Sequence, residues 1–139
     1  MCSTSDQMCY NYSINTRNKV MTIQHAQRTL YVFNHLNDLI GLKLVHSQIN
    51  DVKILGSLTT LTRLKLRGNE IVDIKPLASL NNLQRLDLAD NQISDIRPLA
   101  SLTNLIVLRL ANNRISSEDM NWLRKKLPNC RIFPLQHMS

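Results

Sequence analysis

The sequence predicts an α/β fold of the solenoid type. In this fold a right-handed coil of short units carries a curved parallel sheet on its concave face, short 3₁₀ or helical crossovers on its convex face, and caps at both ends. Three observations lead to this prediction. Residues 91–110 repeat residues 69–88 with thirteen of twenty positions identical. A period of 22 residues aligns the apolar residues in columns. Only 4% of the residues are aromatic, so leucine and isoleucine must fill the interior.

In one half of each unit, the pattern Leu-x-x-Leu-x-Leu predicts a short strand. Two leucines that flank one exposed residue have the period of two that is typical of a strand with one buried face. One such strand is not stable alone, but successive copies can pair in parallel. The buried columns are Leu39, Leu61, Leu83, Leu105 and Leu127; Leu42, Leu64, Leu86, Leu108 and Cys130; and Leu44, Leu66, Leu88, Leu110 and Ile132. We therefore predict five strands, with Cys130 in the core of the fifth rather than acting as a nucleophile.

The other half of each unit predicts the crossover that parallel strands require. Its apolar columns are Val52, Ile74 and Ile96; Leu55, Leu77 and Leu99; and Leu58, Leu80 and Leu102. Pro76 and Pro98 lack a backbone donor and have a restricted φ, which suits a short turn or 3₁₀ helix better than a long helix. Because the crossovers are bulkier than the strands, the stack should curve with the strands on the inside.

The complete pattern, Leu-x-x-Leu-x-Leu-x-x-Asn-x-Ile-x-x-Ile-x-x-Leu-x-x-Leu over residues 39–132, resembles the leucine-rich repeat family. The Asp-Ile-x-Pro-Leu variant is most similar to the 22-residue repeats of bacterial internalin-type proteins, which points to a bacterial source, and is related to the phosphatase-regulatory type of eukaryotes. The resemblance implies that a continuous asparagine ladder links neighbouring repeats and that the concave sheet binds other proteins.

A polar column formed by Asn69, Asn91 and Asn113 lies between buried leucines and isoleucines. A carboxamide has two donors and an acceptor, so it can satisfy backbone groups where the chain leaves a strand. In the first unit Ser47 replaces this asparagine, and Ile54 stands where later units have proline. We expect that unit to be the weaker end.

Both ends of a solenoid must cover its apolar interior. Residues 116–139 predict a capping repeat and tail: Ser116 and Asp119 fit a capping box, Pro128 ends the helix, and Trp122 is expected to cover the last repeat rather than line a ligand pocket. Residues 1–20 are polar and are predicted to be mostly disordered. Residues 21–38 predict an N-terminal cap or a degenerate first repeat.

Signatures of catalysis and of metal or cofactor binding are missing from the pattern. The four histidines are far apart and the three glycines cannot form a phosphate-binding loop. Asp51, Asp73 and Asp95 recur every 22 residues. They fit either paired acid–base carboxylates or, as we expect, structural groups at the solenoid turn. The sequence thus predicts a non-catalytic protein without cofactor or metal. With neither a secretory signal nor an apolar run that could span a membrane, it also predicts a cytoplasmic monomer.

The exposed positions between the strand leucines form the candidate binding surface. The predicted partner-binding residues are Lys43, Arg63, Lys65, Arg67, Arg85, Asp87, Val107 and Arg109, with Ala89 and Ala111 making the far end small and apolar. Like charges on adjacent strands destabilise a sheet, and a partner carboxylate or phosphate would relieve that cost.

The formal net charge of +7 leaves several functions open. The leading hypothesis is a protein-interaction module that binds an acidic protein segment on the concave face. A second is binding of nucleic acid or another polyanion, which the lack of aromatic stacking platforms disfavours. Regulation of a phosphatase rests on the family resemblance alone. The charges could also serve only to keep the sheet soluble.

Overall fold

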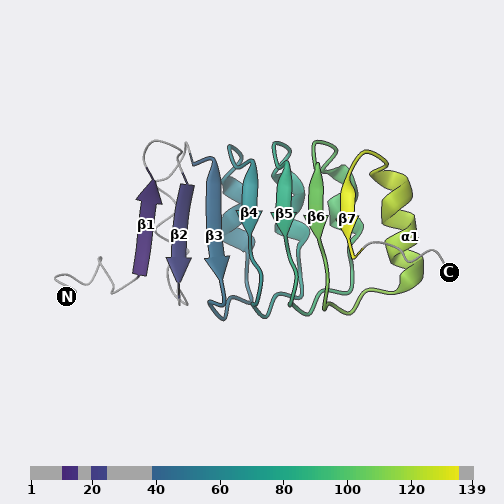
Figure 1. Ribbon diagram of the computed structural model, residues 1–139, viewed down its shortest axis with the longest axis horizontal. Coiled ribbons are helices and arrows are strands. Elements are labelled where there is room, and N and C mark those ends of the chain that lie inside the picture. The colour runs from purple at the N-terminus through teal and green to yellow at the C-terminus, as the bar shows by residue number, and fades with distance from the viewer. Residues whose placement is uncertain (1–10, 16–19, 25–38, 135–139) are drawn as a thin grey trace.

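The computed structural model describes residues 11–15, 20–24 and 39–134, and the strands in these ranges form one seven-stranded curved sheet in the order β1 to β7. The strands lie side by side in chain order, with β2 through β7 parallel and β1 antiparallel to β2 (Figure 1). Their bounds are β1 Asn11–Asn15, β2 Val20–Gln24, β3 Gly41–Val45, β4 Arg63–Lys65, β5 Arg85–Asp87, β6 Val107–Arg109 and β7 Arg131–Phe133.

Short helices return the chain from the end of one parallel strand to the start of the next. The 3₁₀ helices are η2 (Lys53–Ser57), η3 (Lys75–Ser79) and η4 (Arg97–Ser101), and the α-helix α1 (Ser117–Lys126) follows β6. The 3₁₀ helices lie behind the sheet in Figure 1, and α1 lies at the C-terminal end beside β7. Among the described residues, no helix is long and apolar enough to cross a membrane. The predicted solenoid with short 3₁₀ crossovers is confirmed.

The core is a column of aliphatic side chains between the sheet and the crossovers. Leu64, Leu86 and Leu108 lie in register on β4, β5 and β6 and are at most 2% exposed. Leu55, Leu77 and Leu99 are buried from the side of the 3₁₀ helices. Each leucine removed from water stabilises the fold by roughly 2 kcal/mol, so the repeated columns supply most of the driving force for folding.

The 22-residue frame fails in the last unit, and the prediction for its two core columns is wrong. Leu108 pairs with Ile132, two residues beyond Cys130. The reason is the length of the crossover: α1 has ten residues where each 3₁₀ helix has five, so the chain needs more residues to return to the sheet. Ile132 therefore fills the core position expected for Cys130, and Cys130 is only partly buried at the core's margin.

The N-terminal end also differs from expectation. Within the tail that was predicted to be mostly disordered, Asn11–Asn15 form β1 and pair with β2. Pairing satisfies the backbone groups that face β2, an effect that composition alone cannot reveal. Val20–Gln24 lie opposite Gly41–Val45, the place that a strand of a preceding repeat would take. The rest of the predicted tail at 1–10 and 16–19, residues 25–38 of the predicted cap, and the last residues from 135 to 139 lie outside the described residues.

The asparagine column links each repeat to the one before it. The Nδ2 of Asn91 donates to the carbonyl of Leu88 in its own repeat at 3.0 Å and to that of Leu66 in the preceding repeat at 3.0 Å. Its Oδ1 accepts from the backbone N of Ile71 at 3.1 Å. Asn69 and Asn113 make equivalent bonds. Asparagine side chains thus satisfy backbone groups in the buried turns of successive repeats.

Among the described residues, the first repeat shows no such link to a preceding unit. Ser47 is buried, and its hydroxyl donates to the carbonyl of Val45 at 3.1 Å within the same repeat. A serine is too short to reach a neighbouring unit as Asn69 does from the second repeat. That this end is weaker stays a prediction.

A second polar column, which the sequence reading missed, lies at the edge where the strands begin. The Nδ2 of Asn82 donates to the carbonyl of Thr59 at 2.8 Å, and the Nδ2 of Asn104 donates to that of Asn81 at 2.7 Å. The hydroxyl of Thr60 donates to the carbonyl of Leu39 at 2.7 Å. The donors Thr60, Asn82 and Asn104 also recur every 22 positions, so the periodicity of the sequence could have revealed this column.

Candidate protein-binding surface

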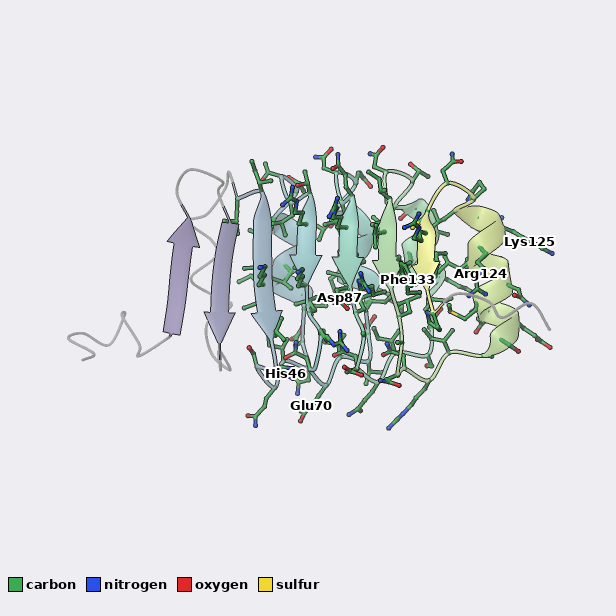
Figure 2. The ribbon with its side chains drawn as sticks, in the orientation of Figure 1. His46, Glu70, Asp87, Arg124, Lys125 and Phe133 are labelled. Atoms are coloured by element: carbon green, nitrogen blue, oxygen red, sulfur yellow. The ribbon has the colours of Figure 1, made fainter. Side chains whose placement is uncertain are left out.

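The concave face consists of two rows of side chains that alternate with the buried leucines. The first row, in register across β3 to β7, is Gly41, Arg63, Arg85, Val107 and Arg131. The second row is Lys43, Lys65, Asp87, Arg109 and Phe133. Figure 2 shows Asp87 on β5 and Phe133 on β7, both on this side of the sheet. The period-2 alternation of each strand fixes which side chains belong to the face.

Four cations on β3, β4 and β5, namely Lys43, Arg63, Lys65 and Arg85, form what we call the basic quartet. All four are exposed. Arg63 lies opposite Arg85 in the register, and Lys43 lies opposite Lys65. Neighbouring strands are about 4.8 Å apart, so like charges face each other at close range. Within the described part of the chain, no member of the quartet forms an ion pair.

Arg67 belongs to the predicted patch but differs from the quartet. Its Nε lies 3.0 Å from Oδ2 of Asp90, with which it forms an ion pair. The Nδ2 of Asn112 donates to Oδ1 of the same carboxylate at 2.6 Å. The Asn112 hydrogen bond, followed by that of Arg67, lowers the pKa of Asp90 below its usual value. Arg67 is therefore already engaged and is less available to a partner.

Replacing Asn112 with glycine should raise the pKa of Asp90 toward its ordinary value, because the largest cause of its depression is removed. Glycine suits the positive φ of 57° at this position. Since the folded-state pKa is the lower one, the network contributes stability above the unfolded-state pKa and loses it as pH falls through the folded-state pKa. An NMR titration of the Asp90 carboxyl carbon measures this. Asn104→Gly, at the opposite edge, should leave the titration unchanged, and an unaltered Asp90 pKa in Asn112→Gly contradicts the prediction.

In the two concave rows on β3 to β7, one residue is acidic, and it is Asp87. It stands between Lys65 and Arg109 in the register. Its Oδ1 accepts from the backbone N of Ala89 at 3.1 Å, so the carboxylate also holds the turn after its own strand. Asp87 separates the basic quartet from the arginines of β6 and β7.

The far end of the face combines apolar and cationic groups. Val107 is half-buried, and the Arg109 guanidinium carbon lies 4.9 Å from the centre of the Phe133 ring. A guanidinium over an aromatic face is held by a cation–π attraction. The 22-residue period missed Arg131 and Phe133 because the register of β7 is shifted. Ala89 is buried and Ala111 is half-buried, so the two small apolar residues predicted for this end add little exposed surface.

The recurrent aspartates hold the crossovers. The Oδ1 atoms of Asp51, Asp73 and Asp95 accept from the backbone N two residues later at 2.9, 2.9 and 3.1 Å. Each aspartate lies one residue before the N-cap and forms a turn with the first residue of a 3₁₀ helix, whose backbone donor lacks a partner within the helix. Of the two readings that the sequence left open, this geometry supports the structural one.

Groups that could carry chemistry are sparse among the described residues. Burial raises the pKa of the Cys130 thiol to about 11, so at neutral pH it is protonated and weakly nucleophilic. In residues 39–134 and the two N-terminal strands, no three histidine, cysteine or acidic side chains lie close enough together to hold a metal ion.

Comparison with known families agrees with this geometry. A family model describing two copies of leucine-rich repeats matches residues 59–101 and, overlapping them, residues 81–125. This chain is a leucine-rich repeat protein. No curated protein sequence matches it.

Solved structures of other leucine-rich repeat proteins share its fold. An internalin of Listeria monocytogenes (InlF) is 32% identical over 77% of this chain, with a TM-score of 0.66. A leucine-rich repeat protein of Leptospira interrogans is 34% identical over 74% of this chain, with a TM-score of 0.67. The repeat ectodomain of the receptor kinase SOBIR1 of Arabidopsis thaliana is 28% identical over 86%, with a TM-score of 0.57.

The chain is short beside these proteins. It covers 30% of the Listeria internalin, 27% of the Leptospira protein and 64% of the SOBIR1 ectodomain. The similarity therefore concerns the repeat architecture, and the functions of these longer proteins are not transferred to this chain.

Proposed function

We propose that this leucine-rich repeat protein is a non-catalytic protein-interaction module that binds a partner on its concave face. Leucine-rich repeat proteins generally mediate protein–protein interaction. The observation that carries the proposal for this chain is the basic quartet: four exposed cations held at fixed positions on a rigid sheet, without carboxylate partners among the described residues.

The chemistry of the quartet favours an acidic protein segment. Guanidinium groups bind carboxylates through paired hydrogen bonds, and Arg63 and Arg85 are direct neighbours in the register. An incoming carboxylate also reduces the repulsion between adjacent like charges, so part of the binding energy comes from the relief of a cost in the free protein. Opposite charge further accelerates encounter with the partner.

Nucleic acid is the second candidate, because the same quartet attracts phosphates. On the concave rows of β3 to β7, however, Phe133 is the one aromatic residue, and a guanidinium covers its ring. Single strands bind best where aromatic rings stack on successive bases. Titration with an oligonucleotide at two salt concentrations tests this second candidate, which requires measurable affinity that falls steeply with salt because phosphate contacts release counterions.

Replacing Arg63, Lys65 and Arg85 together with alanine should weaken binding of the partner by about a hundredfold or more, because each lost charge-assisted hydrogen bond is worth roughly 1.5 kcal/mol. The partner is first captured by the wild-type protein from the source organism, then purified and titrated calorimetrically against each variant. Thermal unfolding of the triple variant should be almost unchanged, since all three side chains are exposed.

The matched control replaces Lys53, Lys75 and Arg97 with alanine. These exposed cations lie one per repeat at the starts of the 3₁₀ helices, and their removal changes the net charge equally on the opposite side of the sheet. If the control weakens binding as much as the concave variant does, net charge rather than the concave face governs recognition, and the assignment of the site is wrong.

A further inference from the structure

We infer that β6 selects the partner's sequence. The recognised segment carries an acidic residue and, two positions away, a bulky apolar residue. The acidic side chain contacts Arg63 and Arg85, and the apolar side chain contacts an apolar corner formed by Ile106 and Val107. This inference rests on the proposed function, because it concerns the partner that the concave face binds.

The first observation is where two almost identical repeats differ. Residues 69–88 and 91–110 differ at seven of twenty positions. Three of these positions lie on or beside the concave rows, and each exchanges the chemical class of the side chain: Gln84 for Ile106, Arg85 for Val107, and Asp87 for Arg109. The leucine columns, the asparagine and the proline are unchanged between the two repeats. Because the scaffold is kept, these differences are free to serve recognition.

The second observation is the exposure of the apolar corner. The side chain of Ile106 is 52% exposed, and Val107 is half-buried next to it. At the equivalent positions the preceding repeat has Gln84 and Arg85, so neither position requires an apolar residue for folding. Ile106 precedes Val107 in the chain, directly before β6, and Val107 lies opposite Arg85 in the register. Aliphatic residues at the edge of a cationic cluster provide a surface from which a bound partner excludes water.

The spacing of the two parts determines the partner's pattern. Val107 lies directly opposite Arg85, which in turn lies opposite Arg63. The distance from the midpoint between Arg63 and Arg85 to β6 is one and a half strand spacings, or about 7 Å. In an extended segment, side chains two residues apart point to the same side and are separated by about 6.6 Å. An extended segment that crosses the strands along the first row therefore matches both contacts at once.

The neighbouring charges are consistent with this orientation. Beyond the apolar corner, the first row ends in Arg131, which is exposed, so a second acidic residue on the far side of the apolar one would also meet a cation. The single acid of the two rows, Asp87, lies in the second row and repels a segment displaced toward it. The first row is thus the track that suits an acidic segment.

The test selects peptides from a random library displayed on phage, with the purified full chain as bait. Enriched peptides should carry an acidic residue and an aliphatic or aromatic residue two positions apart. Synthetic copies of them are then titrated against three proteins: the wild type, Ile106→Gln/Val107→Thr, and Val72→Ser. Gln84 occupies the position equivalent to 106 in the preceding repeat, directly before β5, and Thr is close to Val in shape. The double variant therefore keeps its net charge and should fold.

Binding to the double variant should be about tenfold weaker or more, because the partner's apolar side chain loses its contact surface. Val72→Ser is the matched control. Val72 is 53% exposed on the turn between β4 and η3, away from the concave rows, and serine is the residue of the next repeat at that position. Its affinity should equal that of the wild type.

Selection of acidic peptides without an apolar residue at this spacing overturns the inference, as does equal binding to the wild type and the double variant. Both results leave the proposed function intact if the peptides still require Arg63, Lys65 and Arg85. Failure to enrich any peptide also overturns it. If the peptides bind the variant with alanine at all three of these positions as tightly as they bind the wild type, both the inference and the proposed function are contradicted.

Discussion

Replacing Asn91 with alanine should lower the free energy of unfolding by about 3 kcal/mol. Asn91 is 7% exposed, and its carboxamide bonds to the backbone N of Ile71 and to the carbonyls of Leu66 and Leu88. Alanine leaves these groups in two repeats without partners, in a place that water reaches poorly. The loss exceeds the net value of a typical hydrogen bond because a buried unpaired group costs its full desolvation energy.

Asn82→Ala is the control for this prediction. The Asn82 side chain donates to the carbonyl of Thr59 in the preceding repeat, but it is exposed, so water can replace it. Its loss should cost less than about 1 kcal/mol. Urea unfolding of both variants measures the difference. Equal midpoints for Asn91→Ala and the wild type would show that the ladder does not stabilise the fold.

Replacing Ile132 with alanine should lower the free energy of unfolding by about 3 kcal/mol, whereas Cys130→Ala should cost less than about 1 kcal/mol. Ile132 is 4% exposed and pairs with Leu108, so its removal leaves a cavity under the last strand. Cys130 is only partly buried at the margin of the same core. In the unbroken 22-residue frame, Cys130 would instead have taken the place in line with Leu108.

Urea unfolding again provides the measurement, with Leu108→Ala as the reference for a central core position. We expect Ile132→Ala to resemble Leu108→Ala in the size of its effect. A cost for Cys130→Ala as large as that for Ile132→Ala is incompatible with the shifted register of β7. It would also remove Arg131 and Phe133 from the concave rows, because both belong to the face only through that register.

Most of the fold could be predicted because its determinants are local and repeated. The Leu-x-Leu spacing predicts which side of each strand is buried, and the fixed period predicts that successive strands are neighbours in the sheet. The column of Asn69, Asn91 and Asn113 could be found in the same way, since a polar residue that recurs among buried leucines needs a structural partner. The column of Thr60, Asn82 and Asn104 had an equal periodicity, but its residues resemble ordinary exposed loop residues.

Part of the candidate site could be predicted as well. The alternation placed Lys43, Arg63, Lys65 and Arg85 on one face, and the structure places them there in register. That Arg67 is held by Asp90 was not predictable. These residues are 23 positions apart, and the ion pair depends on the conformation of the turn that follows the strand, where Asp90 has a positive φ of 58°.

The periodic pattern thus determined the solenoid, its aliphatic core and the basic side of its sheet, because each repeat needs the same burial and the same hydrogen bonds. Tertiary structure alone decided how the ends depart from that pattern. The capping helix α1 is longer than the 3₁₀ helices, so the chain needs more residues to return to the sheet. The register of β7 is therefore shifted by two positions, which adds Arg131 and Phe133 to the concave face. At the other end, β1 is a strand because β2 offers its backbone partners, and a five-residue segment inside a mainly polar stretch carries too weak a local signal to predict that pairing.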